Sequence, residues 1–440
     1  MREWLPFVRR PGARGGGGGE SGGAAAAGVG SARSRKLTAD LVALRARIAA
    51  ISSRPRINRS SGDAASPPPP ACHEEATPFG PVMARREWLA DEGACQVAAL
   101  ATCLGFAPDN LQRPLFLDTE TTGLSGGTGT VAFLIGLAWR EGGGLRLVQF
   151  FLSDFNQEDA LLWAVGQYVQ QAGVLVSYNG RTFDWPLLQT RLVMRRIAPS
   201  WPSPPHLDLL TLARRIFKPR LPDCALQTIE QAVLDLHRTE DLPGTLIPSR
   251  YFAWLRHGDE RLLEPVFVHN RQDVLSMALL LARFESMLDG SEELEPLDRF
   301  GRARFFESRG MTSQAVEEYR RLWRQSRGAR AVPFTARGAI GLRLARLLRR
   351  RGMWMEAREV LEECWQTQVF PYPAAIELAK LLEHQARDLD GARRVVGDAL
   401  RLLAIAVVPN PQWQADLEQR VRRLDRRLDT RARPVLGLTG

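Results

Sequence analysis

The stretch PLFLDTETTGL, residues 114–124, is an apolar run that ends in two closely spaced carboxylates, Asp118 and Glu120. If residues 115–120 form a β-strand, alternate side chains lie on opposite faces, so both carboxylates point the same way. Two ionised carboxylates side by side repel, and each raises the pKa of the other. A hard divalent cation such as Mg²⁺ relieves that repulsion, because it takes carboxylate oxygens as ligands. The pair therefore predicts one half of a metal site.

A third acid, Asp184, lies in a setting that suits the same site. A strand-like run at 174–178 and an Asn179-Gly180 turn precede it, and Pro186 follows where the first turn of a helix tolerates proline. This pattern places Asp184 at a helix N-terminus near the exit of a strand. An ordinary helix cap is the plainer alternative for an isolated Asp.

The fourth acid, Asp273, lies in a run whose apolar residues recur at helical spacing. His269 precedes it by four residues, about one turn earlier on the same helical face. A histidine so placed is able to orient or deprotonate a water beside bound metal ions. The plainer alternative is a surface His–Asp pair without a chemical role.

Residues 86–290 around these acids have an α/β pattern. Glycine-rich turns separate three strand-like runs, which predicts an antiparallel meander of 115–118, 131–139 and 145–152. A helix at about 157–171 and the strand at 174–178 follow, and helices are predicted for the remainder. The sequence SGGTGT lacks the ending of a phosphate-binding loop and joins two strands, so it is predicted to be a hairpin turn.

The two flanks differ from this central part. Residues 1–85 contain glycine, alanine and proline runs and are predicted to be mostly disordered, with one amphipathic helix at 38–51. Residues 297–430 are helical with a loose repeat: Arg-Gly-Met followed by alanine recurs after 42 residues, and Arg387 and Ala392 keep the internal offset of five 35 residues later. This periodicity resembles tetratricopeptide (TPR) repeats closed by a charged helix at 412–429, whereas an irregular helical bundle is the alternative.

Charge divides the chain along the same boundaries. Residues 1–85 carry 13 basic and 6 acidic side chains, residues 86–296 carry 18 and 26, and residues 297–440 carry 28 and 17. The central part is therefore acidic and both flanks are basic. Basic flanks attract polyanions, and the arginine-rich segments 343–351 and 420–427 are the predicted recruiting surfaces. Arginines on a solvated helix face are the alternative explanation.

Other features limit the class of protein. The five cysteines form no paired or metal-binding pattern, which favours a reducing cytoplasm over a disulfide scaffold. The N-terminus has no apolar core of a secretory signal, and no apolar stretch approaches the roughly 18–20 residues that span a bilayer. A cytoplasmic protein without membrane contact is expected.

The four acids, in this order, resemble the DnaQ-like (DEDD) exonuclease superfamily of the ribonuclease H-like fold. The second element, NGRTFDWP at 179–186, is similar to the form found in proofreading domains of family B DNA polymerases. The third element departs from the pattern, because His269 stands at the spacing that these enzymes give to a tyrosine. The resemblance implies an α/β fold with a mixed sheet flanked by helices.

A closer resemblance covers residues 77–290 and the repeats. FLDTETTGLSGGTGTVAFLIG, HLDLL, LQTIE, LPGTLIPSRYFAWL and HNRQDV are similar to bacterial YprB-type ribonuclease H-like proteins, which often carry helical repeats after the nuclease-like domain. His206 and Asp208 belong to that pattern and are interpreted as structural, with a role in binding metal or substrate as the alternative. Arg238, Asp241 and Gly244 match too, and the sequence gives no physical reason for them.

The resemblance implies a metal-dependent 3′–5′ exonuclease that acts on single-stranded DNA or RNA and releases nucleoside 5′-monophosphates. Asp118, Glu120, Asp184 and Asp273 would hold two Mg²⁺ or Mn²⁺ ions, and His269 would orient and deprotonate the attacking water. The loop after the first strand would contact the terminal nucleotide, so the expected substrate-binding residues are Thr121, Thr122, Gly123, Leu124 and Asn179.

Two other functions stay open at this point. In the first, the chain is an adaptor whose repeats bind a protein partner and whose nuclease-like domain is a docking module. In the second, it is an RNA-processing endonuclease on the same fold. Substrate choice depends on loops and on contacts with the 2′-hydroxyl, which the sequence does not reveal.

Overall fold

The computed structural model describes residues 72–90, 97–123, 129–197, 201–238, 241–326, 332–406 and 410–432. The predicted helix at 38–51 and the tip of the predicted SGGTGT turn lie outside these residues. None of the helices in the described part of the chain is both long and apolar enough to span a bilayer.

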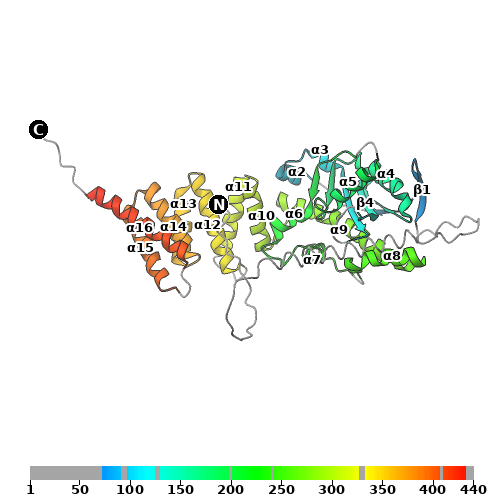
Figure 1. Cartoon of the computed structure of the whole chain (residues 1–440). Helices are drawn as coiled ribbons and strands as arrows, with labels where there is room; N and C mark the ends of the chain where they lie inside the picture. Colours follow the sequence, from blue (N-terminus) through cyan, green and yellow to red (C-terminus); the bar gives the residue numbers. More distant parts are fainter. Residues whose placement is uncertain are drawn as a thin grey trace, which may run out of the picture. The chain divides into compact units, whose positions relative to one another are not determined.

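The first part of the chain combines strands and helices (Figure 1). Its strands are β1 (His73–Thr77), β2 (Gly80–Ala90), β3 (Pro114–Thr121), β4 (Ala132–Glu141), β5 (Gly144–Phe151), β6 (Val174–Ser177) and β7 (His206–Asp208). Its α-helices are α2 (Ala98–Leu104), α3 (Pro108–Gln112), α4 (Glu158–Val169), α5 (Asp184–Arg195), α6 (Leu209–Phe217), α7 (Leu226–Val233), α8 (Ile247–His257) and α9 (Glu264–Asp289). Short 3₁₀ turns are η1 (Phe155–Gln157), η2 (Gly244–Leu246) and η3 (Glu260–Leu262).

The second part is helical, coloured yellow to red in Figure 1. It contains α10 (Pro296–Ser308), α11 (Thr312–Gln325), α12 (Phe334–Arg350), α13 (Trp354–Gln366), α14 (Pro371–Leu381), the π-helical turn η4 (Leu382–Ala386), α15 (Leu389–Ala404) and α16 (Pro411–Ala432). The α/β class, the mixed sheet and the helical C-terminal region are as predicted.

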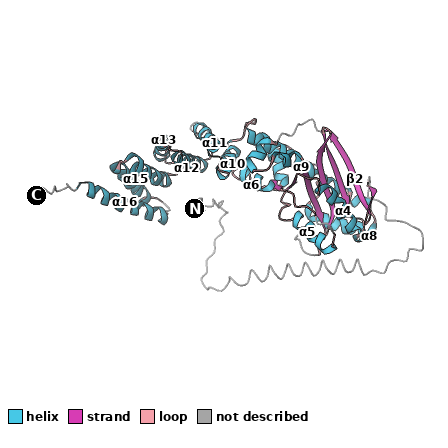
Figure 2. Ribbon diagram, turned by 90° about the horizontal axis from the view of Figure 1, so that it is seen from above, coloured by secondary structure: helices cyan, strands magenta, loops and turns pink. Residues whose placement is uncertain are grey.

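The strands, magenta in Figure 2, form one mixed sheet. Their order is β1-β2-β5-β4-β3-β6-β7. β3, β4 and β5 pair antiparallel, which confirms the predicted meander. β6 pairs parallel with β3, and β7 pairs parallel with β6. β3 thus lies inside the sheet, where its carboxylates are surrounded by neighbouring strands.

The sheet begins earlier than the sequence predicted. β1 and most of β2 fall within residues 1–85, which were assigned to a disordered segment, and the short strand β7 was not predicted. Three consecutive charged residues, 85–87, interrupt the alternation that signals a strand. Each of them forms an ion pair with another element, so the sheet accommodates them: Arg85–Glu264, Arg86–Glu75 and Glu87–Arg271.

Helices pack on both faces of the sheet. Tyr168 of α4 lies against Trp139 and Phe150 on one face. On the opposite face, α9 contacts β3, β4 and β5. Because residues two apart on a strand share a face, Asp118 and Glu120 both belong to the α9 face. The apolar core of this face continues through α6 and α10 into the helical part of the chain.

The helical part consists of hairpins whose turns repeat. Gly310 and Gly352 adopt left-handed backbone angles (φ 74° and 76°) between α10 and α11 and between α12 and α13. Arg387 takes the same position (φ 54°) before α15. Glycine adopts this conformation at little cost, which explains the recurring Arg-Gly-Met motif. The repeated alanines, Ala315, Ala357 and Ala392, are fully buried, as the close approach of paired helices requires.

Candidate functional site

The four predicted acids come from three elements that meet at one end of β3. Asp118 and Glu120 lie on β3, Asp184 is the first residue of α5, and Asp273 lies in the middle of α9. The parallel pairing of β3 with β6 brings the chain from β6 into α5 past the same end of the sheet. The topology therefore collects side chains that are far apart in sequence.

Asn270 lies on the face of the sheet that α9 covers, and it fixes the side chain of Asp118 there. Asp118, Gly136 and Gln149 lie opposite one another on β3, β4 and β5. Asn270 of α9 lies over Gly136, and a Cβ atom there would be 2.2 Å from Asn270 Oδ1. Asn270 Nδ2 donates to Asp118 Oδ2 at 2.9 Å, and Gln149 Nε2 donates to Asn270 Oδ1 at 2.9 Å. Because Asn270 and Gln149 are buried, this chain of hydrogen bonds orients the carboxylate rigidly.

Asp184 is held close to β3 by a compact turn. Asn179 has a left-handed backbone (φ 69°), and a Cβ atom at Gly180 would lie 2.9 Å from Asp184 Oδ2. Thr119 Oγ1 donates to Asp184 Oδ1. Asp184 is thus the first residue of its helix and is turned toward the β3 acids, so the plainer alternative of an isolated helix cap does not describe it.

Asp208 supports this turn from β7. Its carboxylate accepts from the backbone N–H of Asn179 at 2.9 Å and of Leu210 at 3.0 Å, which also caps α6. His206 Nε2 lies 2.7 Å from Ser177 Oγ, and burial lowers the pKa of His206 to about 4. These contacts agree with the structural interpretation of both residues.

Arg238 is the residue of this site that sequence reasoning did not explain. Its guanidinium donates to Glu230 at 2.5 and 2.6 Å, to Asp241 at 3.2 Å and to Asp273 Oδ1 at 2.5 Å. Glu230 is completely buried and also accepts from Ser276 Oγ. Arg238 and Asp241, which match the family pattern, therefore contact the acid cluster. In the sequence, that pattern was the sole indication of their role.

His269 lies between two carboxylates. Its Nδ1 is 2.8 Å from Asp241 Oδ1, and its Nε2 is 3.7 Å from Asp273 Oδ2. Arg238 Nη1 also lies 3.5 Å from Nδ1, but the shorter contact with Asp241 assigns the Nδ1 proton as the donor. In the neutral ring, Nε2 then carries the free lone pair and faces Asp273.

The four carboxylates act on one another electrostatically. Burial, and then the charges of Asp273, Glu120 and Asp184, raise the pKa of Asp118 well above its usual value. Burial and the charges of Asp273 and Asp184 do the same to Glu120. Burial raises the pKa of Asp184 to about 6, although Thr119 opposes the shift. Burial also raises the pKa of Asp273, against the opposing effects of His269 and Arg238.

This donor set has the chemistry that a hard divalent cation requires, namely several carboxylates whose charge Arg238 compensates only in part. In the ranges that the structure describes, however, no three His, Cys, Asp or Glu side chains are arranged so that they hold one ion as they stand. Arg238 takes one oxygen of Asp273, and Thr119 takes one of Asp184. A metal ion bound to all four acids would therefore use the other oxygens of these two carboxylates or displace the two donors.

The expected substrate-binding residues differ in their contacts and in their burial. Thr121 Oγ1 donates to the carbonyl oxygen of Gly123 at 2.8 Å. Thr122 is buried, and both its backbone N–H and its hydroxyl bond Val131, so it closes the β3–β4 hairpin. Asn179 is half-buried and accepts from Thr182 Oγ1. Leu124 lies outside the described residues.

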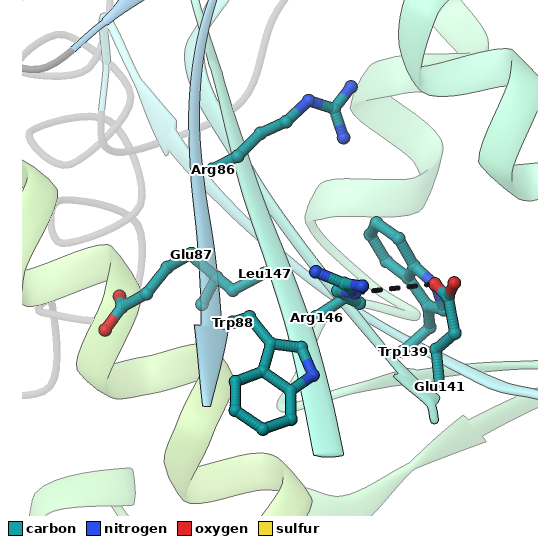
Figure 3. Close-up of a pocket in the computed structure, with 7 residues that line it drawn as sticks. All are labelled: Arg86, Glu87, Trp88, Trp139, Glu141, Arg146 and Leu147. Carbon is teal, nitrogen blue, oxygen red and sulfur yellow. Dashed lines mark hydrogen bonds and ion pairs between the residues drawn. The ribbon is translucent and has the colours of Figure 1, made fainter. Parts of the chain in front are cut away.

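A separate surface pocket lies on the opposite face of the sheet (Figure 3). Trp88, Arg146 and Trp139 form a row across β2, β5 and β4. Glu141 accepts from Trp139 Nε1 at 3.0 Å and pairs with Arg146 at 3.7 Å. None of the four acids lines this pocket, so it is not part of the candidate site.

Comparisons with known proteins agree with this fold. A family model described as the RNase_H superfamily matches residues 115–284, which include all four acids. The chain is 33% identical over 301 residues to the uncharacterized protein YprB of Bacillus subtilis (strain 168), and the match covers 67% of this chain and 70% of that protein.

Among solved structures, the family B DNA polymerase from the hyperthermophilic archaeon Pyrobaculum calidifontis matches with a TM-score of 0.33 and 17% sequence identity. This match covers 47% of the present chain and 29% of the polymerase chain. The nuclease-type fold of the RNase_H match implies that the chain binds nucleic acid. From the match to YprB, supported by that to the superfamily, the chain belongs to the ribonuclease H superfamily and, within it, to the YprB-type proteins.

Proposed function

We propose that this protein is a metal-dependent nuclease that degrades single-stranded nucleic acid from the 3′ end. The observation that carries the proposal is the mutual electrostatic coupling of Asp118, Glu120, Asp184 and Asp273, which come from three elements. A protein keeps four partly buried carboxylates together at a cost in stability, because burial and repulsion both oppose their ionisation. A function that uses their charge explains that cost.

In this proposal the four carboxylates hold two Mg²⁺ or Mn²⁺ ions. When bound, such ions lower the pKa of a water and stabilise charge on the phosphate and on the leaving oxygen. Asn270 keeps the Asp118 carboxylate turned toward the site, and Asp241 fixes the tautomer of His269. The Nε2 atom of His269 is then free to accept a proton from a water held beside Asp273.

The test uses the purified full chain with Mn²⁺ and 5′-labelled single-stranded DNA or RNA. A ladder of shortened products is expected. The variant Asp118→Asn keeps an oxygen that accepts from Asn270, so it should fold normally and lose cleavage by orders of magnitude. The matched control is Asp235→Asn, because the Asp235 side chain is 99% exposed. Cleavage that persists in Asp118→Asn would rule out this site.

One observation favours a second function, that of a nucleic-acid-binding or docking module without catalysis. Arg238 already places a cation beside Asp273. In a binding module without catalysis, the acid cluster would keep this cation permanently. The same assay separates the alternatives: internal cuts indicate an endonuclease, and an intact substrate that still binds indicates the module.

A further inference from the structure

The two arginine-rich segments that the sequence singled out meet in the fold. The C-terminal part of α12 and the middle of α16 both face α14 and η4. Together they line a pocket, here named the repeat pocket, formed by Arg349, Lys380, His384, Gln385, Arg420 and Arg423. All six lining side chains are basic or neutral, and none is acidic.

Glu377 of α14 supports one side of the repeat pocket. It is 7% exposed and pairs with Arg349 at 2.9 Å, Lys380 at 3.0 Å and Arg346 at 3.6 Å. Although burial opposes it, these cations hold the pKa of Glu377 below its usual value. The carboxylate therefore stays ionised and fixes the three cations in place.

Glu383 of the π-helical turn η4 supports the other side. It is 2% exposed and pairs with Arg427 at 2.6 Å, Arg420 at 3.4 Å and Arg423. Burial again opposes ionisation, but Arg427 and Arg423 lower the pKa of Glu383. Single π-helical turns inside helices are often found at functional sites.

The cations outnumber the carboxylates that hold them. Six cationic side chains, three on each side, face two glutamates. Asp416 is a further carboxylate that acts on Arg420, and the balance stays positive when it is counted. Burial and the neighbouring charge of Arg423 lower the pKa of Arg420, which is the sign of cations crowded together.

Two hydrogen-bond donors in the pocket wall have no acceptor. The Nε atoms of Arg420 and Arg423 are buried and lack a hydrogen-bond partner among the described residues. A buried donor left unpaired costs free energy. The excess of positive charge around the pocket is the observation that indicates an anionic ligand.

We propose that the repeat pocket binds backbone phosphates of single-stranded nucleic acid and thereby supplies substrate affinity that the acidic domain lacks. Nucleic acid is the occupant because residues 86–296 carry 26 acidic and 18 basic side chains and repel a polyanion, whereas residues 297–440 carry 17 and 28. Guanidinium groups also match phosphate oxygens in a bidentate geometry. The choice of polyanion rests on the proposed function.

This pocket refines the prediction from the sequence. The prediction took the whole segments 343–351 and 420–427 as recruiting surfaces. Arg343 instead pairs with Glu307 at 2.7 Å, outside the pocket lining. Only the arginines that line the pocket, namely Arg349, Arg420 and Arg423, are assigned to phosphate binding.

Binding of fluorescent dT20 to the full chain in EDTA, measured by fluorescence anisotropy, tests the inference. The variant Lys380→Gln/Arg423→Gln removes one cation from each glutamate and leaves two, so neither carboxylate is left buried without a partner. We expect affinity to fall at least about tenfold at low salt. The slope of log K against log salt should become shallower by roughly 1.4, because each phosphate that is no longer neutralised reduces it by about 0.7.

The matched control is Arg358→Gln/Arg401→Gln, which removes the same charge. Each of these arginines is exposed and pairs with a carboxylate of its own helix, Glu362 or Asp398. The control should keep the affinity and the salt slope of the wild type. Equal losses in both double variants would overturn the pocket and leave only a diffuse charge effect.

Two further outcomes decide the inference. Wild-type affinity in Lys380→Gln/Arg423→Gln, with an unchanged melting temperature, would overturn it. Tighter binding of a labelled poly-glutamate peptide than of dT20 would also overturn it and assign the pocket to an acidic protein segment. The p-nitrophenyl ester of thymidine 5′-monophosphate is too small to need the repeat pocket for binding. Its Mn²⁺-dependent hydrolysis therefore tests the acid cluster independently of that pocket.

Discussion

Arg238 donates a 2.5 Å hydrogen bond to Asp273 Oδ1 and so places a permanent cation inside the acid cluster. A divalent ion that binds Asp273 must compete with this guanidinium and is repelled by its charge. The variant Arg238→Gln should therefore bind Mn²⁺ more tightly, by about tenfold for a nearby unit charge partly screened by solvent. Titration of the metal-free protein followed by electron paramagnetic resonance measures this affinity.

The same substitution should lower stability, because Glu230 is completely buried and would lose its cation. Breaking a buried pair by removal of one partner costs about 3–5 kcal/mol. Arg238→Lys keeps the charge and should show Mn²⁺ affinity near that of the wild type. Arg256→Gln removes an exposed arginine from the same domain as a control. Unchanged or weaker Mn²⁺ binding in Arg238→Gln would contradict competition.

Gly136→Ala should disturb the site through Asn270. The new Cβ atom would lie 2.2 Å from Asn270 Oδ1, and the buried amide is unable to move without breaking its bonds to Asp118 and Gln149. We expect a decrease in stability of roughly 2–4 kcal/mol, since each buried polar group left unpaired costs about 1–3 kcal/mol. Thermal unfolding measures this decrease. Gly244→Ala has open space around the added methyl group and should be neutral.

The sequence predicted the meander and the elements that carry Asp118, Glu120 and Asp184 because these depend on local patterns. Alternation placed Asp118 and Glu120 on one face, and the Asn179-Gly180 turn placed Asp184 at a helix start. The helical hairpins were predictable for the same reason, since Gly310 and Gly352 lie where the turn requires a residue with a left-handed backbone.

Arg238 and Asn270 were not predictable in this way. In the sequence, nothing distinguishes Asn270 from other polar residues of a helix. Its role depends on the fold, which places it over Gly136. Arg238 lies in an irregular segment with no periodicity, and its partners come from α7, α9 and the loop at Asp241. Their roles exist only in the tertiary contacts, which a single sequence does not display.

The stability of the metal-free protein should depend on pH through Asp184. Its pKa is about 6 in the folded protein against 3.8 for the unperturbed group, so the folded state binds more protons between these values. Stability from this group is therefore greatest below about pH 4, falls as pH rises toward 6, and stays lost above that. Asp184→Asn should be more stable than wild type at pH 7, by roughly 1–3 kcal/mol at about 1.4 kcal/mol per pKa unit.

Melting temperatures of both proteins between pH 4 and 8 in EDTA check this sign. The advantage of Asp184→Asn should shrink toward zero at the acidic end. Saturating Mn²⁺ at pH 7 should stabilise the wild type more than the variant, because the ion offsets the same repulsion. A difference that does not change with pH would show that burial and repulsion at Asp184 are not relieved by protonation.

Gly301→Ala should loosen the packing of α10 against α6. A Cβ atom at Gly301 would lie 1.9 Å from the carbonyl oxygen of Ile216, and backbone atoms of a packed helix move only if the two helices separate. The turn that follows α6 is also joined to α10 by the Arg220–Asp298 ion pair at 2.7 Å. Overpacking of this kind costs about 1–3 kcal/mol. Gly397→Ala on α15 meets only the flexible ends of Arg393 and Arg401, so the usual gain of roughly 0.5–1 kcal/mol for alanine in a helix should appear instead. Opposite shifts of the melting temperature in the two variants are expected, and a stabilised Gly301→Ala would mean that α6 and α10 do not pack this closely.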